Sequence, residues 1–571
     1  MESKRHGMPQ QALLLMMFIF CIIQPIFATT SPNRAFNKLA DEFFDSYLFP
    51  YHPSLATQLG VHIYDDKLKD YSKAGINKNI QLLKQIEQRV SAIDPLLLNQ
   101  AHQGDRELIL NYCRSELLTL ETIRPWEKNP AYYSRGIARG AHVLMKRKFA
   151  SANNRLRVFI EREKLMPAVL EEARKNLDNP PQIYTEIAIE QLNGLIKFFQ
   201  TDVPLAFIDA DDSNLKQALM DSNLNVLSAL HAYQTWLTKT LLPRSQGNFR
   251  IGTEAFIKKL QYDEMVDTPL EQLLAIGYSD LRKNQLAYKR IHLELEAEHA
   301  AAKHVLPDQV LPAFSNSFDG LIEFIQNKNI ITIPSMVRPI TQETPPFSRA
   351  TSSASMDTPG PFEKQANEAY LNVTLPKKNI NKEVTTLREI NHSSINITSI
   401  HESYPGHYVQ FLWMHKLHNR VRQILGAKTN SEGWAHYCEQ MMLDEGYGGA
   451  IDSHDAKMLR LGQLRKALLR NARFIVGIKM HTSNMKIDEA VDFFIKEGYQ
   501  SQVTSRKEVK RGTSNPTYLY YTLGKLQILK LRAELQAKQG DTFDLQRFHD
   551  DFMRQGRPPL KIVRRALLGE A

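Results

Sequence analysis

The sequence has few cysteines and few glycines. Three of its 571 residues are cysteines, and Cys21 lies in an N-terminal apolar segment, so only Cys113 and Cys438 belong to the rest of the chain. Two thiols cannot build a disulfide scaffold, and nothing in the sequence indicates that they meet. The low count also argues against a zinc site made of thiolates. Neither a glycine-rich phosphate loop nor a dinucleotide-binding fingerprint occurs among the 26 glycines.

A concentrated basic stripe is also missing. Cleavage after Ala28 would remove Glu2, Lys4 and Arg5, which lowers the formal net charge from +10 to +9. The densest basic run, residues 416–422, has three cations interrupted by His and Leu. Such a mild excess favours an anionic surface or anionic substrates. We expect no nucleic-acid partner, and a basic surface-binding protein is the least favoured class.

Long apolar runs are absent except for one near the N-terminus. Residues 12–23 are twelve consecutive apolar residues that follow the basic Lys4 and Arg5. The run is shorter than the roughly 20 residues of a membrane span, and the pattern is typical of a secretory signal peptide over residues 1–28. Cys21 follows Phe20 rather than a small residue, which argues against lipoprotein processing. We expect a periplasmic or secreted protein, with an uncleaved membrane anchor as the alternative.

Residues that favour helices dominate the remaining chain. Apolar positions recur at helical spacing over residues 105–123, 154–177, 183–199, 212–241 and 269–301. The predicted fold is mostly α, with one catalytic domain over 29–571. Its N-terminal helical part covers about 29–325, and its metal-site part covers about 326–571.

Two short segments are typical of β-strands, residues 330–333 and 370–375. Turn signals rich in proline, serine and threonine lie between them. A small sheet is therefore expected near the metal site. The second segment either binds an extended peptide by strand addition or forms a plain surface hairpin.

The segment from His401 to His407 groups two imidazoles with the carboxylate of Glu402. Histidines six residues apart on a regular helix point about 240° apart and cannot share a metal ion. Pro405 disfavours a regular turn, and Gly406 permits a backbone bulge. A bulge there would return His407 to the angle of the usual four-residue spacing. We expect a helix to continue from 408 to 425.

A second motif follows at residues 432–439. At 100° per residue, Glu432, His436 and Glu439 fall within about 60° of one another on a helix. The pattern is typical of a solvated polar face, but it also offers the third ligand that a hydrolytic zinc site needs. In that case Glu439 would support a ligand or hold a substrate amine.

These motifs together resemble the bacterial family known as domain of unknown function 885 (DUF885). The matching residues are His401, Glu402, Pro405, Gly406, His407, Glu432, Gly433, Trp434, Ala435, Tyr437 and Glu439, then Arg473, His481, Glu508, Arg511, Pro516 and 521–525. The resemblance is dense from about 385 to 532 and diffuse elsewhere. The family resembles zincin-type metallopeptidases, which implies a large helical fold with a small sheet near the metal.

The resemblance implies roles for these residues. His401, His407 and Glu432 would bind one Zn²⁺ per chain. Glu402 would act as the general base that activates zinc-bound water. Tyr521 is the first candidate for stabilising the oxyanion, ahead of His481 and Arg511. The remaining residues, Glu439, Arg473, Arg511 and Tyr520, are assigned to substrate binding or to support of the ligands, although each arginine is as well explained by pairing with a neighbouring acid.

The sequence departs from the family pattern at Gly477, His436 and Gly512, so substrate preference is not transferred. The predicted function is an exported zinc metallopeptidase that hydrolyses peptides or oligopeptides. Two alternatives remain: a hydrolase of other amides or esters, and a catalytically inactive binding protein that retains the fold. Glu402 distinguishes the peptidase from the binding protein, because only the peptidase needs this carboxylate for turnover.

Overall fold

A computed structural model describes residues 31–298, 305–349, 352–375 and 391–569. The predicted signal peptide lies outside the described residues. The prediction of a mostly helical protein with a small sheet is confirmed, because helices dominate and one three-stranded sheet is present. None of the described helices combines the length and apolar character needed to cross a membrane.

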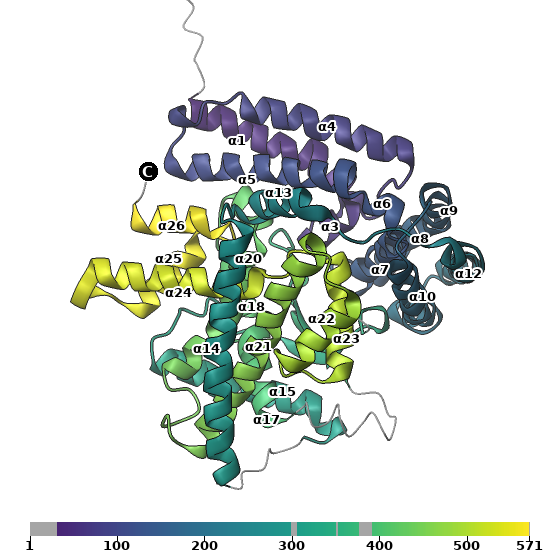
Figure 1. The fold of residues 1–571 in the computed structure, drawn as a ribbon. Helices are drawn as coiled ribbons and strands as arrows, with labels where there is room; N and C mark the ends of the chain where they lie inside the picture. The colour runs from purple at the N-terminus through teal and green to yellow at the C-terminus, as the bar shows by residue number, and fades with distance from the viewer. Residues whose placement is uncertain (1–30, 299–304, 350–351, 376–390, 570–571) are drawn as a thin grey trace, which may run out of the picture.

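The first helices form a layer across one end of the molecule (Figure 1). They are α1 (Pro32–Glu42), α4 (Lys73–Ser91) and α5 (Gln100–Leu117), and the short helices α2 (Phe49–Tyr51) and α3 (Pro53–Leu59) come between α1 and α4 in the chain. Their apolar faces meet in a core that contains Phe36, Phe43 and Leu83. The predicted helix at 105–123 is confirmed by α5 and the turn of π-helix that continues to Ile123.

The next helices form a bundle at one side of the molecule (Figure 1). They are α6 (Pro125–Lys128), α7 (Ala131–Met145), α8 (Ala152–Lys164), α9 (Met166–Asn176), α10 (Gln182–Lys197), α11 (Val203–Ala206) and α12 (Ser213–Trp236). A separate apolar core, with Leu156, Leu192 and Leu230, lies inside this bundle. The single helix expected over 154–177 is in fact two, because Leu165 ends α8 and Pro167 lies in the first turn of α9.

The remaining helices belong to the part of the chain that carries the candidate site. They are α13 (Gly252–Glu264), α14 (Leu270–Ala297), α15 (Val310–Asn327), α17 (His392–Glu402), α18 (His407–Met414), α19 (Arg420–Ile424), α20 (Lys428–Asp444), α21 (His454–Thr482), α22 (Ile487–Lys496), α23 (Gln502–Ser514), α24 (Tyr520–Gln539), α25 (Leu545–Arg554) and α26 (Leu560–Leu568). The long α14 packs along α21. Helices α20 and α24 approach closely at Gly433 and Gly524, where a Cβ on Gly433 would lie 2.6 Å from the Gly524 Cα.

The sheet consists of β1 (Ile340–Glu343), β2 (Ala354–Asp357) and β3 (Tyr370–Val373) in the order β1-β3-β2. Strand β3 is parallel to β1 and antiparallel to β2. Leu371 and Val373 of β3 are buried in the core beneath it. Strand β2 is therefore an edge strand, whereas β3 is central.

The strand predictions are partly wrong. Residues 330–333 form no strand; Ile330 and Ile331 are buried in an irregular segment, where the Ile330 carbonyl accepts from His549. Segment 370–375 does contain β3, but both of its edges are occupied. It can neither accept a peptide strand nor form a surface hairpin.

The two thiols of the described residues do not pair. Cys113 is buried in the core of the N-terminal layer. Cys438 of α20 is buried in the separate core that also contains Leu371 and Val373. Both therefore act as small apolar side chains.

Candidate metal centre

The first histidine motif occupies the end of one helix and the start of the next. Asn391 caps the N-terminus of α17 in a capping box with Ser394, and the helix then ends at Glu402. Residues 403–406 turn, with a cis bond between Tyr404 and Pro405, and α18 begins at His407. The motif thus spans a helix break.

The predicted bulge within a continuous helix is wrong. At the turn, a Cβ on Gly406 would lie 1.9 Å from the His401 carbonyl oxygen, so only glycine allows this approach. The helix expected over 408–425 is likewise interrupted, because α18 ends at Met414 and α19 begins at Arg420. The break achieves what the bulge was expected to do, since the imidazole centroids of His401 and His407 lie only 4.9 Å apart.

Helix α20 brings the second motif to the same place. The buried Glu264 of α13 caps its N-terminus, accepting from the Thr429 backbone N–H at 2.8 Å and from its hydroxyl at 2.6 Å. The Trp434 indole N–H donates to the Pro405 carbonyl at 2.9 Å. The cap holds the start of α20 against α13, and the Trp434 contact, two residues from Glu432, holds α20 against the turn between α17 and α18.

His401, His407 and Glu432 converge on one point. Their ligand atoms lie within 4.8 Å of one another, and no other group in the described ranges meets this criterion for a metal site. The Glu432 Oε2 lies 3.5 Å from His401 Nε2 and 3.4 Å from His407 Nε2. Two atoms that each bind a tetrahedral Zn²⁺ at about 2.1 Å are roughly 3.4 Å apart. Two imidazoles and one carboxylate in this geometry therefore fit a zinc ion.

Electrostatics at the three residues also favour a cation. Burial opposes a charge on His401, but hydrogen bonds to Glu432 and Glu439 raise its pKa to about 9. Burial likewise opposes the charge on Glu432, yet the two imidazoles hold the pKa of that carboxyl well below its usual range. The site thus stabilises positive charge between its donors.

Glu439 lies where the sequence placed it, behind a predicted ligand. Its Oε1 accepts from His401 Nδ1 at 2.7 Å and lies 2.8 Å from Arg470 Nη2. A carboxylate behind an imidazole orients the ring and leaves its other nitrogen free for a metal. Because this carboxylate is fully buried and already engaged, it supports His401 rather than a substrate amine. The pKa of the adjacent His436 falls to about 3 through burial, so that ring is neutral.

The candidate site opens into a cavity of about 990 Å³. Glu402 lines it, and its Oε2 accepts from the Met356 backbone N–H of β2 at 3.0 Å. This places the carboxylate of Glu402 beside the edge strand. Phe411 also lines the cavity and stacks on His407, with centroids 6.0 Å apart.

Tyr521 reaches the same cavity from the start of α24. Its hydroxyl donates to Glu432 Oε1 at 3.1 Å and accepts from Arg511 Nη2 at 2.8 Å. The neighbouring Tyr520, also predicted for this site, does not line the cavity, and its hydroxyl accepts from Asn515 at 2.9 Å. The structure thus singles out one tyrosine where the sequence offered several.

His481, predicted as a catalytic candidate, does not lie at the site. It is eight residues beyond Arg473 on α21, which corresponds to about 12 Å along the helix axis. Its Nε2 lies 2.9 Å from the Gly512 carbonyl oxygen, and its Nδ1 lies 3.4 Å from the Ile251 amide nitrogen. Burial lowers its pKa to about 4. The cavity lining does not include His481, so the structure does not support a role for it at the reacting atoms.

Arg473 lines the cavity but is paired with an acid. Of its two predicted roles, substrate binding and pairing with a neighbouring acid, the structure thus shows the second. It donates to both oxygens of Glu508, at 2.7 and 2.8 Å. Burial opposes the charge on Glu508, but Arg473 lowers its pKa to about 2. Arg511 makes no such pair in the described chain and instead donates to Tyr521.

The Arg473–Glu508 pair predicts a pH-dependent stability. Glu508 has a pKa near 4.5 when unfolded and about 2 when folded. The pair therefore stabilises the fold fully above pH 4.5, by about 3 kcal/mol, and this contribution is lost as the pH falls toward 2. Urea unfolding of Glu508→Gln should show a deficit at pH 7 that narrows steadily at pH 4 and pH 3. A deficit that stays constant with pH would mean that the carboxyl is not ionised.

Two of the departures from the family pattern pack around one ring. A Cβ on Gly477 would lie 2.8 Å from the Tyr518 ring, and a Cβ on Gly512 would lie 2.4 Å from its hydroxyl oxygen. Neither glycine lines the cavity. These substitutions accommodate Tyr518 and leave the candidate substrate cavity intact.

The sequence interpretation missed Arg470, Phe411 and Met356. Arg470 lies one turn before Arg473, and Phe411 lies one turn after His407, so helical spacing could have found both. No sequence signal pointed to Met356, because its contribution is a backbone N–H from a strand that was not predicted.

Comparisons with known proteins agree with this fold. A family model for a bacterial protein of unknown function, DUF885, matches residues 53–567. No curated protein matches the chain.

Two solved structures are similar over nearly the whole chain. One is described as a candidate lipoprotein of unknown function from Shewanella oneidensis; it is 26% identical, with a TM-score of 0.75, and the match covers 94% of this chain and 100% of that one. The other is described as a candidate lipoprotein from Colwellia psychrerythraea; it is 16% identical, with a TM-score of 0.77, and the match covers 95% and 99%. The second likeness concerns the fold alone.

Proposed function

The chain belongs to the DUF885 family of bacterial proteins of unknown function, and within that family we propose that it is a zinc-dependent peptidase with a zincin-type site. The observation that carries this proposal is the convergence of His401, His407 and Glu432 in a cavity that the carboxylate of Glu402 also lines. Two imidazoles and a carboxylate are the ligand set of hydrolytic zinc sites with an open fourth position.

Each residue has a distinct task in hydrolysis. When bound, zinc supplies Lewis acidity that polarises a carbonyl and acidifies water. Glu402 takes a proton from the attacking water and passes it to the leaving amine. The Tyr521 hydroxyl donates to the carbonyl oxygen on which negative charge develops. Glu439 and Arg470 keep the His401 ring oriented throughout.

The neighbouring edge strand supports a peptide as the substrate. Strand β2 has β3 on one side only and lines the cavity through residues 354–356. An extended peptide can pair with the free side of such a strand, next to Glu402. A large cavity with several cations and a strand edge suits an oligopeptide better than a small ester.

Export to the periplasm or the cell exterior is part of this proposal. The N-terminal sequence has the pattern of a signal peptide, and two structural relatives are described as candidate lipoproteins. A membrane-associated exported protein is consistent with both.

Elemental analysis of the purified protein tests the metal site directly. The wild type should contain one zinc per chain, and His407→Ala should contain almost none, because two donors hold the ion poorly. Glu402→Gln is the matched control, since it alters the cavity without removing a ligand and should retain the metal. Wild-type protein that binds no stoichiometric metal after zinc is added would contradict the proposal.

A further inference from the structure

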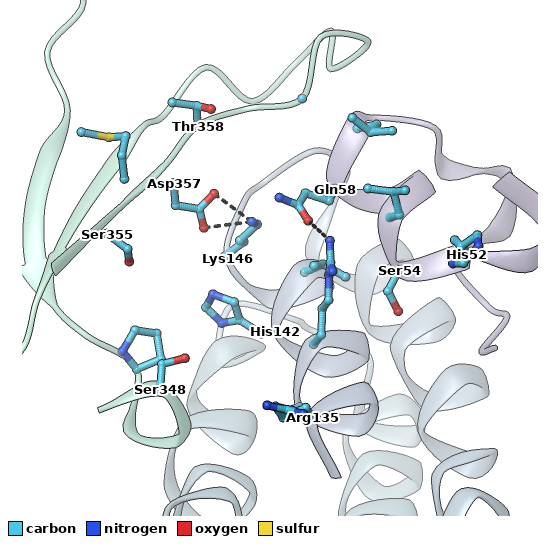
Figure 2. Close-up of a pocket in the computed structure, with 18 of the residues that line it drawn as sticks. His52, Ser54, Gln58, Arg135, His142, Lys146, Ser348, Ser355, Asp357 and Thr358 are labelled. Atoms are coloured by element: carbon cyan, nitrogen blue, oxygen red, sulfur yellow. Dashed lines mark hydrogen bonds and ion pairs between the residues drawn. The ribbon is translucent and has the colours of Figure 1, made fainter. Parts of the chain in front are cut away.

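A second cavity, of about 800 Å³, is lined in part by residues 355–357 of β2. Figure 2 shows it between α7, which carries Arg135 and His142 and is followed directly by Lys146, and the strand that carries Ser355 and Asp357. We call it the arginine chamber. None of the zinc-site residues lines it.

The chamber is strongly cationic. Its lining includes five lysines and arginines but only one acid, Asp357. That acid is already engaged, because Lys146 and Arg147 both donate to it at 2.8 Å. Burial lowers the pKa of His142 to about 4, so this ring adds no charge of its own near neutral pH. The remaining cations are thus not balanced from within.

Three arginines of the chamber have no carboxylate partner in the part of the chain that the structure describes. Arg135 donates to the Ala131 carbonyl at 3.1 Å, and Arg139 donates to Gln58 at 2.5 Å. Arg557 lies over the Phe411 ring at 5.3 Å, and its Nε has no hydrogen-bond partner. Arg135 and Arg139 are exposed to solvent, and Arg557 is half-buried. Accessible guanidinium groups that have no carboxylate partner within the chain can bind an anion from outside.

The chamber adjoins the metal-site cavity. Six residues line both: Arg135, Gln191, Ser355, Met356, Phe411 and Arg557. Phe411 marks the junction, since it contacts His407 on one side and Arg557 on the other. A chain that crosses the metal site can therefore extend into the chamber.

Polar atoms along this path also lack partners. The Gln191 Oε1 at the junction and the Thr344 Oγ1 in the chamber wall are buried without a hydrogen bond. Thr344 is only 1% exposed. Buried polar atoms are normally satisfied, so these two are suited to the backbone of a bound peptide.

We propose that the arginine chamber binds a carboxylate of the peptide substrate, either an acidic side chain or the C-terminal carboxylate. Arg135 and Arg139 are one turn apart on α7, so their guanidinium groups can share one carboxylate, and guanidinium binds carboxylate in a planar, two-bond geometry. This inference rests on the proposed function, which makes the substrate a peptide. It adds that the peptide carries a carboxylate where it enters the chamber.

Calorimetry on the metal-free protein tests the chamber without hydrolysis. Three blocked hexapeptides serve as probes: one with glutamates and an amidated end, one with glutamines and a free C-terminus, and one with glutamines and an amidated end. At least one carboxylate peptide should bind about tenfold more tightly than the neutral one. The stronger of the two identifies the source of the carboxylate.

The double variant Arg135→Gln/Arg139→Gln should lose this preference. Its matched control is Arg34→Gln/Arg157→Gln, which removes the same charge from exposed helix positions outside the chamber. Arg135→Gln alone serves if the double variant does not fold, because that side chain is solvent-accessible. Equal binding of all three peptides, or an equal loss in the control, would overturn the proposal. A zinc-loaded enzyme that hydrolyses none of the peptides would instead contradict the peptidase function. The calorimetry would still show whether the chamber binds a carboxylate.

Discussion

Replacement of Glu402 by glutamine is expected to lower kcat for peptide hydrolysis by about 10²- to 10⁴-fold, which is the usual contribution of a general base. Glutamine has the same shape, and its oxygen can still accept from the Met356 N–H that lies 3.0 Å from Glu402. The variant should therefore fold, keep its metal and bind peptide. It cannot take a proton from water, and so turnover alone should be lost.

The assay uses a peptide that the wild type cleaves, with kcat and KM measured separately. A fall in kcat with little change in KM identifies an interaction made in the transition state. Activity within about tenfold of the wild type would assign the proton transfer to another group. A wild type that binds zinc and peptides but cleaves nothing would favour the binding-protein alternative.

Much of this site could be predicted because its donors lie in two short contiguous motifs. Helical spacing placed Glu432 and Glu439 on one side of α20, and the structure has both facing the His401 ring. Local pattern was sufficient there, because one turn of helix fixes the relative position of side chains three or four residues apart. Their roles in metal binding and catalysis remain predictions.

Local pattern was insufficient wherever contacts between distant segments decide the outcome. The break at Gly406 depends on its close approach to the His401 carbonyl, and spacing alone suggested a bulge instead. Strand β2 has the sequence Ala-Ser-Met-Asp, which alternates apolar and polar residues but is only four residues long and contains no β-branched or aromatic residue. It forms because β3 offers a free edge, a fact that no short window contains.

The arginines show the same limit. The sequence could not distinguish an arginine that neutralises a neighbouring acid from one that faces a cavity. In the structure Arg473 pairs with Glu508, Arg470 pairs with Glu439, and Arg511 donates to Tyr521. These partners are separated by up to 35 residues along the chain. Only the three-dimensional structure therefore shows which arginines and lysines have no acidic partner and remain available to a substrate.

Tyr521→Phe should produce the second large loss, about 10²- to 10³-fold in kcat, as removal of an oxyanion donor usually does. The substitution deletes one hydroxyl and keeps the ring, which lies 4.8 Å from the Arg473 guanidinium carbon. In the resting site this hydroxyl donates to Glu432 and accepts from Arg511. With the hydroxyl gone, the developing negative charge loses a donor, whereas KM should change little.

Tyr520→Phe is the matched control, since it removes a hydroxyl from the adjacent residue. That hydroxyl faces Asn515 and lies outside the cavity lining, so kcat should fall less than about threefold. Zinc content of both variants must equal that of the wild type, because Glu432 is also a proposed ligand. Equal losses in the two variants would show that the hydroxyls matter for packing. A loss confined to Tyr521→Phe, with metal retained, would place its hydroxyl at the reacting carbonyl.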